Sequence, residues 1–155
     1  MSRLGAAVTV VTTGGAHGKV GFTATAVCSV SDDPPTLLVC VHRMSRAGQI
    51  LRRNDVLCVN VLRAGENAIA DVFAGRTGTW GVERFSTGDW LTLETGAPVL
   101  ASALVSIECR LIEVKAVATH DIFFAAVQGI RHGLAGPALI YYGRVYAAAD
   151  AVPTM

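Results

Sequence analysis

Short stretches rich in valine, isoleucine and threonine recur along the chain, and most of them end at a turn signal. The sharpest signal is Asp32-Asp33-Pro34-Pro35, because two prolines cannot continue a sheet. The predicted strands cover residues 6–13, 21–31, 36–41, 57–62, 104–114, 121–130, 138–141 and 144–148. Only residues 45–53, with Ser45 as the N-cap, and residues 66–73 have the pattern of short helices.

This succession of strands predicts a mainly β fold with short peripheral helices. We expect a small Greek-key barrel, because closing a sheet removes its exposed edges. Residues 75–98 are glycine-rich and are expected to be irregular, with Trp80 and Trp90 as anchors. No repeat, linker or low-complexity tract divides the chain, so residues 1–155 are predicted to form one domain.

The composition is unusually apolar for a soluble monomer, since 52% of the residues are hydrophobic and 16% are charged. No apolar run approaches the ~18 residues of a membrane helix. We therefore expect no membrane partner, and we interpret the apolar surplus as surface buried in a homodimer.

The net charge of +1, with scattered basic residues, argues against a nucleic-acid partner. The N-terminal sequence lacks a signal-peptide pattern, which favours a cytoplasmic protein.

The cysteines and histidines are dispersed and follow no known catalytic or metal-binding spacing. The cysteines have no CxxC pair and are expected to be buried free thiols: they are Cys28, Cys40, Cys58 and Cys109. The four histidines lie in turns or near strand ends, so a metal site is not expected. No nucleophile, base and acid can be combined from these residues, and a bound cofactor would have to supply the chemistry.

The segment GFTATAVCSVS (residues 21–31) has two different faces if it is a strand, because side chains alternate along a strand. One face carries the hydroxyl groups of Thr23, Thr25, Ser29 and Ser31. The other carries small or apolar side chains, namely those of Phe22, Ala24, Ala26, Cys28 and Val30. The segment is either an ordinary half-buried strand with its hydroxyls in water, or a surface whose hydroxyls and backbone meet a flat ligand.

Several motifs, in the same order, resemble those of the short-chain flavin reductases, the reductase components of two-component flavin monooxygenases. They are GFTATAVCSVSDDPPTLLVCV (21–41), LCVNVL (57–62), VFAG (72–75), ERF (83–85), ALVSIECRL (103–111), THDIFF (119–124) and LIYYGRVY (139–146). The chain is most similar to the branches that serve the pyrimidine-utilisation oxygenase, through SVSDDPPTLLVC and THDIFF, and 4-hydroxyphenylacetate monooxygenase, through GFTATAVCSV.

The resemblance implies a split β-barrel of the FMN-binding type, a homodimer, and oxidation of NADH or NADPH. The product would be reduced FMN or FAD, which diffuses to a separate oxygenase component. A non-enzymatic flavin-binding protein of the same fold stays open as an alternative.

The resemblance also implies site residues. Thr23, Ala24, Thr25 and Ala26 would lie along the isoalloxazine ring. A second flavin segment maps to Cys40, Val41, His42, Ser45 and Arg46, with Ser45 and Arg46 at the phosphate or, alternatively, only capping a helix. Phe73 and Ala74 would cover the flavin from the side. His120 would lie near the nicotinamide or serve only at a strand end, and Tyr142 would shape the nicotinamide pocket or pack in the dimer.

Overall fold

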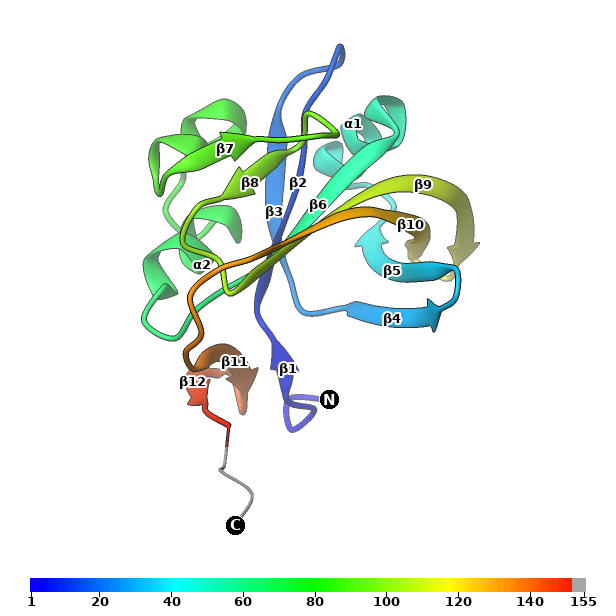
Figure 1. Cartoon of the computed structure of the whole chain (residues 1–155). Coiled ribbons are helices and arrows are strands. Elements are labelled where there is room, and N and C mark those ends of the chain that lie inside the picture. The colour runs from blue at the N-terminus through cyan, green and yellow to red at the C-terminus, as the bar shows by residue number, and fades with distance from the viewer. Residues whose placement is uncertain (152–155) are drawn as a thin grey trace.

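The computed structural model describes residues 1–151 and is built mainly from antiparallel strands (Figure 1). The strands are β1 (Ala6–Ala7), β2 (Thr9–Thr13), β3 (Val20–Ala24), β4 (Val27–Asp32), β5 (Pro35–His42), β6 (Val56–Val61), β7 (Trp90–Thr92), β8 (Pro98–Leu100), β9 (Val105–Val117), β10 (His120–His132), β11 (Ala138–Tyr142) and β12 (Val145–Ala149). The helices are α1 (Arg46–Asn54), α2 (Asn67–Phe73) and the 3-10 helix η1 (Gly81–Ser86).

Seven strands form one sheet in the order β3-β2-β6-β9-β10-β5-β4. Its two edge strands, β3 and β4, follow each other in the sequence and are joined only by Thr25 and Ala26. Ala24 and Val27 can therefore be no more than about 11 Å apart, so the two edges meet at this corner. The sheet curls round into a split barrel, and the expected fold is confirmed.

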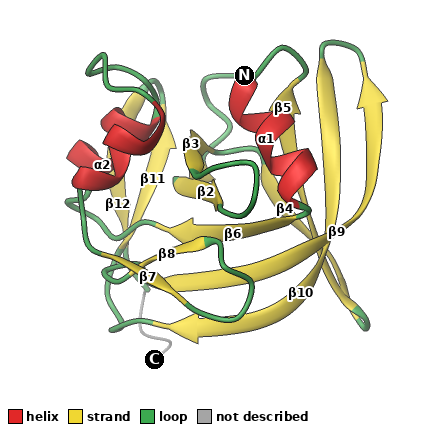
Figure 2. Ribbon diagram, turned by 90° about the horizontal axis from the view of Figure 1, so that it is seen from above, coloured by secondary structure: helices red, strands yellow, loops and turns green. Residues whose placement is uncertain are grey.

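Two smaller sheets lie beside the barrel. The strands β1, β11 and β12 form the first, which lies below the barrel near the N-terminus in Figure 1. The hairpin of β7 and β8 forms the second, with Trp90 opposite Leu100. Figure 2 shows α1 and α2 on different sides of the molecule. Helix α1 contacts β2, β3 and β6, and α2 contacts β2 and β3. None of the helices in residues 1–151 is long and apolar enough to span a membrane.

The core has two main parts. Inside the barrel, Val39, Leu57 and Phe123 are fully or almost fully buried among other aliphatic residues. The second part lies between α2, η1 and the small hairpin, where the rings of Phe73, Phe85 and Trp90 pack edge to face or tilted, with centroids 5.0–5.3 Å apart. Burying each large side chain contributes roughly 1.5–3 kcal/mol, so these contacts fix α2 and η1 against the barrel.

The predicted element boundaries differ from the structure at three points. Residues 6–13 form two strands of different sheets, because Val8 donates its amide to Leu139 and accepts from Leu62 with its carbonyl. The predicted strand 21–31 breaks at Thr25 and Ala26, where the chain crosses between the sheet edges. Residues 75–98, predicted to be irregular, contain η1 and β7 and lead into β8. Trp80 is exposed there, so of the two tryptophans expected as anchors Trp90 alone packs against the core.

The two predicted helices are confirmed within one or two residues at each end. Ser45 is the N-cap of α1, because its Oγ accepts a hydrogen bond from the amide of Gly48 (3.2 Å). The cysteine prediction holds only in part. Cys58 and Cys109 are buried and Cys40 is half-buried, but Cys28 is exposed on the edge strand β4, and all four are free thiols.

Candidate active site

A cavity of about 250 Å³ lies between the β3–β4 corner and the turn that leads from β5 into α1. It is lined by Phe22, Thr23, Ala24, Thr25, Ala26, Cys40, Val41, His42 and Ser45. Apart from Phe22, every one of these residues belongs to the two flavin segments expected from the sequence. The structure brings the segments together because β4 pairs with β5, which places Val27 opposite Val39.

The corner residues Thr25 and Ala26 offer backbone donors to this cavity. Both residues are exposed, and within residues 1–151 neither backbone amide has a hydrogen-bond partner. The carbonyl of Ala26 accepts from the amide of Cys40 (3.0 Å), which fixes the corner against β5. Small side chains here let a ligand approach the backbone closely. The corner is therefore suited to a flat ligand with acceptor atoms on its edge.

The two residues before the corner are held inside the protein. Thr23 Oγ1 donates to the carbonyl of Ala70 in α2 (2.7 Å), and the carbonyl of Ala24 accepts from Thr9 Oγ1 (2.7 Å). Ala24 is also a core residue with 9% of its surface exposed. The segment 21–31 thus combines both interpretations: all four residues line the cavity, but Thr23 and Ala24 are also tied into the protein interior, whereas Thr25 and Ala26 are exposed.

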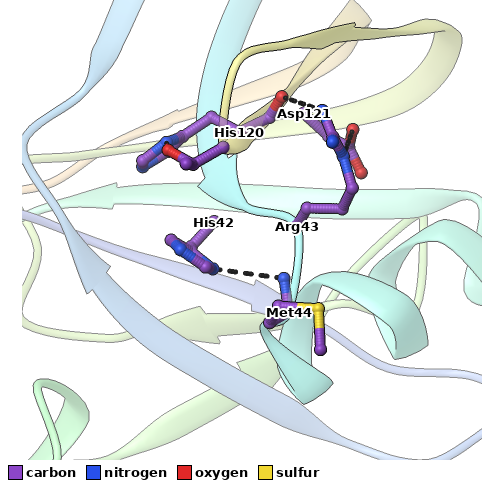
Figure 3. Close-up of polar contacts among 6 residues, drawn as sticks. His42, Arg43, Met44, His120 and Asp121 are labelled. Carbon is purple, nitrogen blue, oxygen red and sulfur yellow. Dashed lines mark hydrogen bonds and ion pairs between the residues drawn. The ribbon is translucent and has the colours of Figure 1, made fainter.

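His120 lies beside His42 (Figure 3), which lines the cavity, but His120 itself is not among the lining residues. The two residues are opposite each other in the β5–β10 ladder, and their rings meet edge to face with centroids 5.2 Å apart. His42 Nδ1 accepts from the amide of Met44 (3.2 Å), which leaves its Nε2 to carry the proton in the neutral ring. His120 Nδ1 is 2.9 Å from Thr119 Oγ1. A ligand in the cavity would therefore meet the ring of His42, with His120 as the neighbour of that ring.

Arg43, which directly follows His42, contacts the residues around His120. Its Nε lies 3.3 Å from Asp121 Oδ1, and its Nη2 donates to the carbonyl of His120 (3.2 Å) (Figure 3). Its amide also donates to the carbonyl of Thr119 (2.9 Å). These bonds tie the end of β5 to the start of β10, so Arg43 positions His120 relative to the cavity.

Ser45 and Arg46 stand at the start of α1 but face different surroundings. Ser45 lines the cavity at the β3–β4 corner, and its hydroxyl accepts the hydrogen bond that caps α1. The guanidinium of Arg46 lies over the Trp80 ring, 5.2 Å from its centroid, in an adjoining cavity. A phosphate at this point would meet the first amides of α1 and a cationic side chain.

The structure does not bring the side chains of Phe73 and Tyr142 to this cavity. Phe73 is buried in the aromatic cluster with Phe85 and Trp90. Tyr142 is exposed at the end of β11, whereas its neighbour Tyr141 points toward α2, because side chains alternate along a strand. Ala74, the C-cap of α2, lies in a separate cavity that shares Thr23 and Thr25 with the first.

Sequence reasoning missed the polar network beside that separate cavity, which has a volume of about 190 Å³. Tyr146 donates to Asp71 Oδ1 (2.7 Å), and Arg76 Nη1 lies 2.9 Å from the same oxygen. The rings of Tyr141 and Tyr146 pack edge to face beside them. Only the aromatic spacing of YYGRVY could have indicated this site, and that spacing also fits an ordinary hairpin. Within residues 1–151, no three His, Cys, Asp or Glu side chains gather in a metal-binding arrangement.

Comparison with known proteins decides the family, because the family described as "Flavin reductase like domain" matches residues 1–150. The chain belongs to the flavin reductase-like family. It is 49% identical over 153 residues to the FMN reductase (NADH) RutF of Ancylobacter novellus, an alignment that covers 99% of this chain and 83% of that protein.

Two solved structures of flavin reductases share the fold along nearly the whole length. BorF, the flavin reductase component of a bacterial two-component tryptophan halogenase, has a TM-score of 0.90 and 30% identity over 97% of this chain and 94% of its own. The NADH:FAD oxidoreductase of Streptomyces globisporus, solved with NAD and FAD fragments, has a TM-score of 0.86 and 32% identity over 94% of this chain and 86% of its own.

Proposed function

We propose that this chain is a flavin reductase that oxidises NADH or NADPH and produces reduced FMN or FAD. The observation that carries the proposal is the cavity between the β3–β4 corner and β5, which is lined by Thr25 and Ala26, whose amides have no hydrogen-bond partner within residues 1–151. The names of the related proteins, an FMN reductase that uses NADH and an NADH:FAD oxidoreductase, support the same chemistry.

The residues present fit a flavin. The isoalloxazine ring is flat and carries nitrogen and carbonyl acceptors, which match the two adjacent amide donors at the corner. The small side chain of Ala26 leaves room for the ring against the backbone. Ser45 and Arg46 lie at the N-terminal end of α1, where a phosphate is favoured by free amides and positive charge.

A bound flavin accepts a hydride from the reduced nicotinamide, and the reaction also takes up one proton from solvent. The protein binds and orients the two rings and brings them to near-attack distance. In this proposal the amides of Thr25 and Ala26 hold the flavin edge, and His120 orients the nicotinamide amide group. Arg43 keeps His120 in place through its carbonyl and Asp121. No nucleophile or strong base is needed for this transfer.

We also propose a homodimer that releases reduced flavin to a separate oxygenase by diffusion. An apolar groove of about 350 Å³ supports the dimer: it runs between β1 and β4 and includes Ala6, Ala7, Val27 and Cys28. Large exposed apolar residues, among them Leu4, Val30 and Ile130, add surface that a second chain would cover. The role as a component of a two-component system is proposed by analogy with BorF, the flavin reductase component of a two-component halogenase.

The decisive experiment measures oxidation of NADH and of NADPH by the purified protein with FMN, FAD or no flavin added. We expect oxidation that depends on added flavin, with reduced flavin accumulating in the absence of oxygen. The variant His120→Ala tests the role of this histidine in the same assay: its turnover should fall, while its flavin affinity should stay close to the wild-type value. Flavin binding without any oxidation of either nicotinamide would instead favour a flavin-binding protein without reductase activity.

A further inference from the structure

A cavity of about 380 Å³ lies between α1, the end of β5 and the hairpin of β9 and β10. We call it the α1 cavity, and the reaction proposed above makes no use of it. Its volume is in the range of small-molecule sites, which usually measure about 300–1,000 Å³. Val41 and His42 line both the α1 cavity and the cavity at the β3–β4 corner. The end of β5 is therefore a wall that the two cavities share.

The sheet side of the α1 cavity is mostly aliphatic. Asp121 is opposite Val41 in β5 and opposite Ala116 in β9. Phe123, two residues further along β10, is opposite Val114, so all five side chains lie on one face of the sheet. Phe123 and Val41 are buried, whereas Val114 is half-buried and Ala116 is exposed. The apolar surface that a ligand would meet here is therefore aliphatic.

The helix side of the α1 cavity is held close to the sheet by a glycine. A Cβ atom on Gly48 would lie 2.9 Å from Val41 Cγ1, so a larger residue would push α1 away from β5. Gln49 and Arg52 also line the cavity, and Arg52 is three residues after Gln49 and four after Gly48. Residues at these spacings are neighbours on a helix surface. One side of α1 thus presents an amide and a guanidinium residue to the cavity.

The charges of the lining residues favour an anion. Two arginines, Arg43 and Arg52, and one carboxylate residue, Asp121, line the α1 cavity, so positive charge is in excess. Arg43 Nε lies 3.3 Å from Asp121 Oδ1, whereas Arg52 forms no ion pair within residues 1–151. Guanidinium groups bind carboxylates through two parallel hydrogen bonds. The cavity is therefore suited to an anion that also carries an apolar chain.

We propose that the α1 cavity is an effector site for a small aliphatic monocarboxylate. The carboxylate pairs with Arg52, and the aliphatic chain lies along Val114 and Ala116. The inference rests on the proposed flavin reductase function, because the effect of the ligand is on turnover.

Arg43 connects the α1 cavity with the proposed reaction. It lines the cavity, and its Nη2 donates to the carbonyl of His120 (3.2 Å) (Figure 3). A carboxylate in the cavity competes with Asp121 for the Arg43 guanidinium and weakens the contacts that hold His120. The bound ligand should therefore slow the oxidation of NADH and leave flavin affinity nearly unchanged.

Calorimetric titration with hexanoate tests the site without turnover. Hexanamide has a chain of the same length without the charge, and acetate has the charge without the chain. The variants are Arg52→Gln and, as the matched control, Arg53→Gln. Arg53 is also exposed and in the last turn of α1, but it lies outside the cavity lining.

Hexanoate should bind the wild type and Arg53→Gln equally. It should bind Arg52→Gln about ten-fold more weakly, because a charge-assisted hydrogen bond is lost. Hexanamide and acetate should each bind the wild type at least about ten-fold more weakly than hexanoate. In assays with FMN, hexanoate should lower the turnover of NADH by the wild type and by Arg53→Gln, and the same concentration should have little effect on Arg52→Gln.

The inference would be overturned by a wild type that does not bind hexanoate, by equal binding to Arg52→Gln, or by binding that leaves turnover unchanged. Oxidation of NADH with FMN and without hexanoate is measured in parallel. Its presence without hexanoate binding refutes only the role of the α1 cavity. Its absence refutes the proposed function and the effector role with it, while the titration still decides whether the cavity binds the carboxylate.

Discussion

Ala24 and Ala26 lie two residues apart in the same segment, but their surroundings are opposite. Ala24 ends β3 with its side chain in the barrel core, next to residues such as Val11 and Val39. Ala26 is exposed and lines the cavity at the β3–β4 corner, where the flavin ring is proposed to bind. A larger side chain should therefore disturb the fold at the first position and only ligand binding at the second.

The two alanines allow a paired prediction. Ala24→Val should lower the free energy of unfolding by about 1–3 kcal/mol, because overpacking strains the core, and a lower melting temperature would show it. Ala26→Leu should leave the melting temperature near the wild-type value and weaken FMN binding about ten-fold or more, since the added atoms occupy the proposed ring position. Unchanged flavin titrations for Ala26→Leu would mean that the flavin does not lie against this corner.

Arg46 allows the phosphate site to be separated from the ring site. A charge-assisted hydrogen bond to a phosphate contributes roughly 1.5–3 kcal/mol. Arg46→Ala should therefore weaken FMN binding about ten-fold or more and leave riboflavin binding nearly unchanged. Fluorescence titration with both flavins measures the difference. Arg53→Ala, which removes the same charge from the other end of α1, is the control. Equal losses for FMN and riboflavin would exclude the phosphate role of Arg46.

Sequence alone could assign some of the site residues but not others. The corner Thr25-Ala26 and the segment from Cys40 to Ser45 are local motifs, and the structure places both at one cavity. Phe73 and Tyr142 belong to motifs as well, but a motif does not say which way a side chain points. The ring of Phe73 is drawn into the core by Phe85 and Trp90, which are distant in sequence. Such contacts depend on how β7, β8 and η1 pack.

At the scale of elements, α2 and β12 are joined by the side chains of Asp71, Arg76 and Tyr146. Burial, followed by the hydrogen bond to Asp71, raises the pKa of the Tyr146 hydroxyl from its ordinary value of 10.0 to about 12. The folded protein therefore retains this proton at pH values where the unfolded chain loses it. The contribution of this group to the free energy of unfolding is fully present below about pH 10 and is lost as the pH rises toward about 12.

This linkage predicts the behaviour of Tyr146→Phe. Below about pH 10 the variant should be less stable than the wild type by about 1 kcal/mol, the usual effect of losing one hydrogen bond. The difference between the two proteins should shrink between about pH 10 and pH 12, because only the wild type carries this proton. Urea unfolding of both proteins at several pH values measures it. A difference that is constant with pH would show that Tyr146 has no raised pKa.

The type of most elements was predictable from the sequence, whereas the partners of several were not. The helix from Arg46 to Asn54 has a local signal, the cap at Ser45, and was predicted within one residue. The division of residues 6–13 at Val8 depends on amide and carbonyl bonds to Leu139 and Leu62. Those partners lie far away in the chain, so no local pattern of valine and threonine indicates the break. The short hairpin of β7 and β8 was missed for the same reason.

At the scale of the whole molecule, the corner of the barrel also shapes the proposed dimer surface. Since β3 passes directly into β4 at Thr25 and Ala26, the edge strand β4 is presented beside β1. The groove between them contains small and apolar residues, including Ala6, Ala7 and Cys28. An exposed apolar groove beside an edge strand is a surface that soluble proteins usually cover. The excess of hydrophobic residues in the sequence predicted such a surface but could not locate it.

The proposed dimer predicts a mass of about twice 16.2 kDa by light scattering at micromolar concentration. Reducing agent should leave the mass unchanged, which separates apolar association from a disulfide through the exposed Cys28. Cys28→Arg should yield monomers, because it places a charged side chain in the groove. Val82→Arg adds the same charge at an exposed position outside the groove and should remain dimeric. A dimeric Cys28→Arg would place the interface elsewhere. A wild-type monomer that still reduces flavin would show that the barrel works alone and that the groove has another occupant.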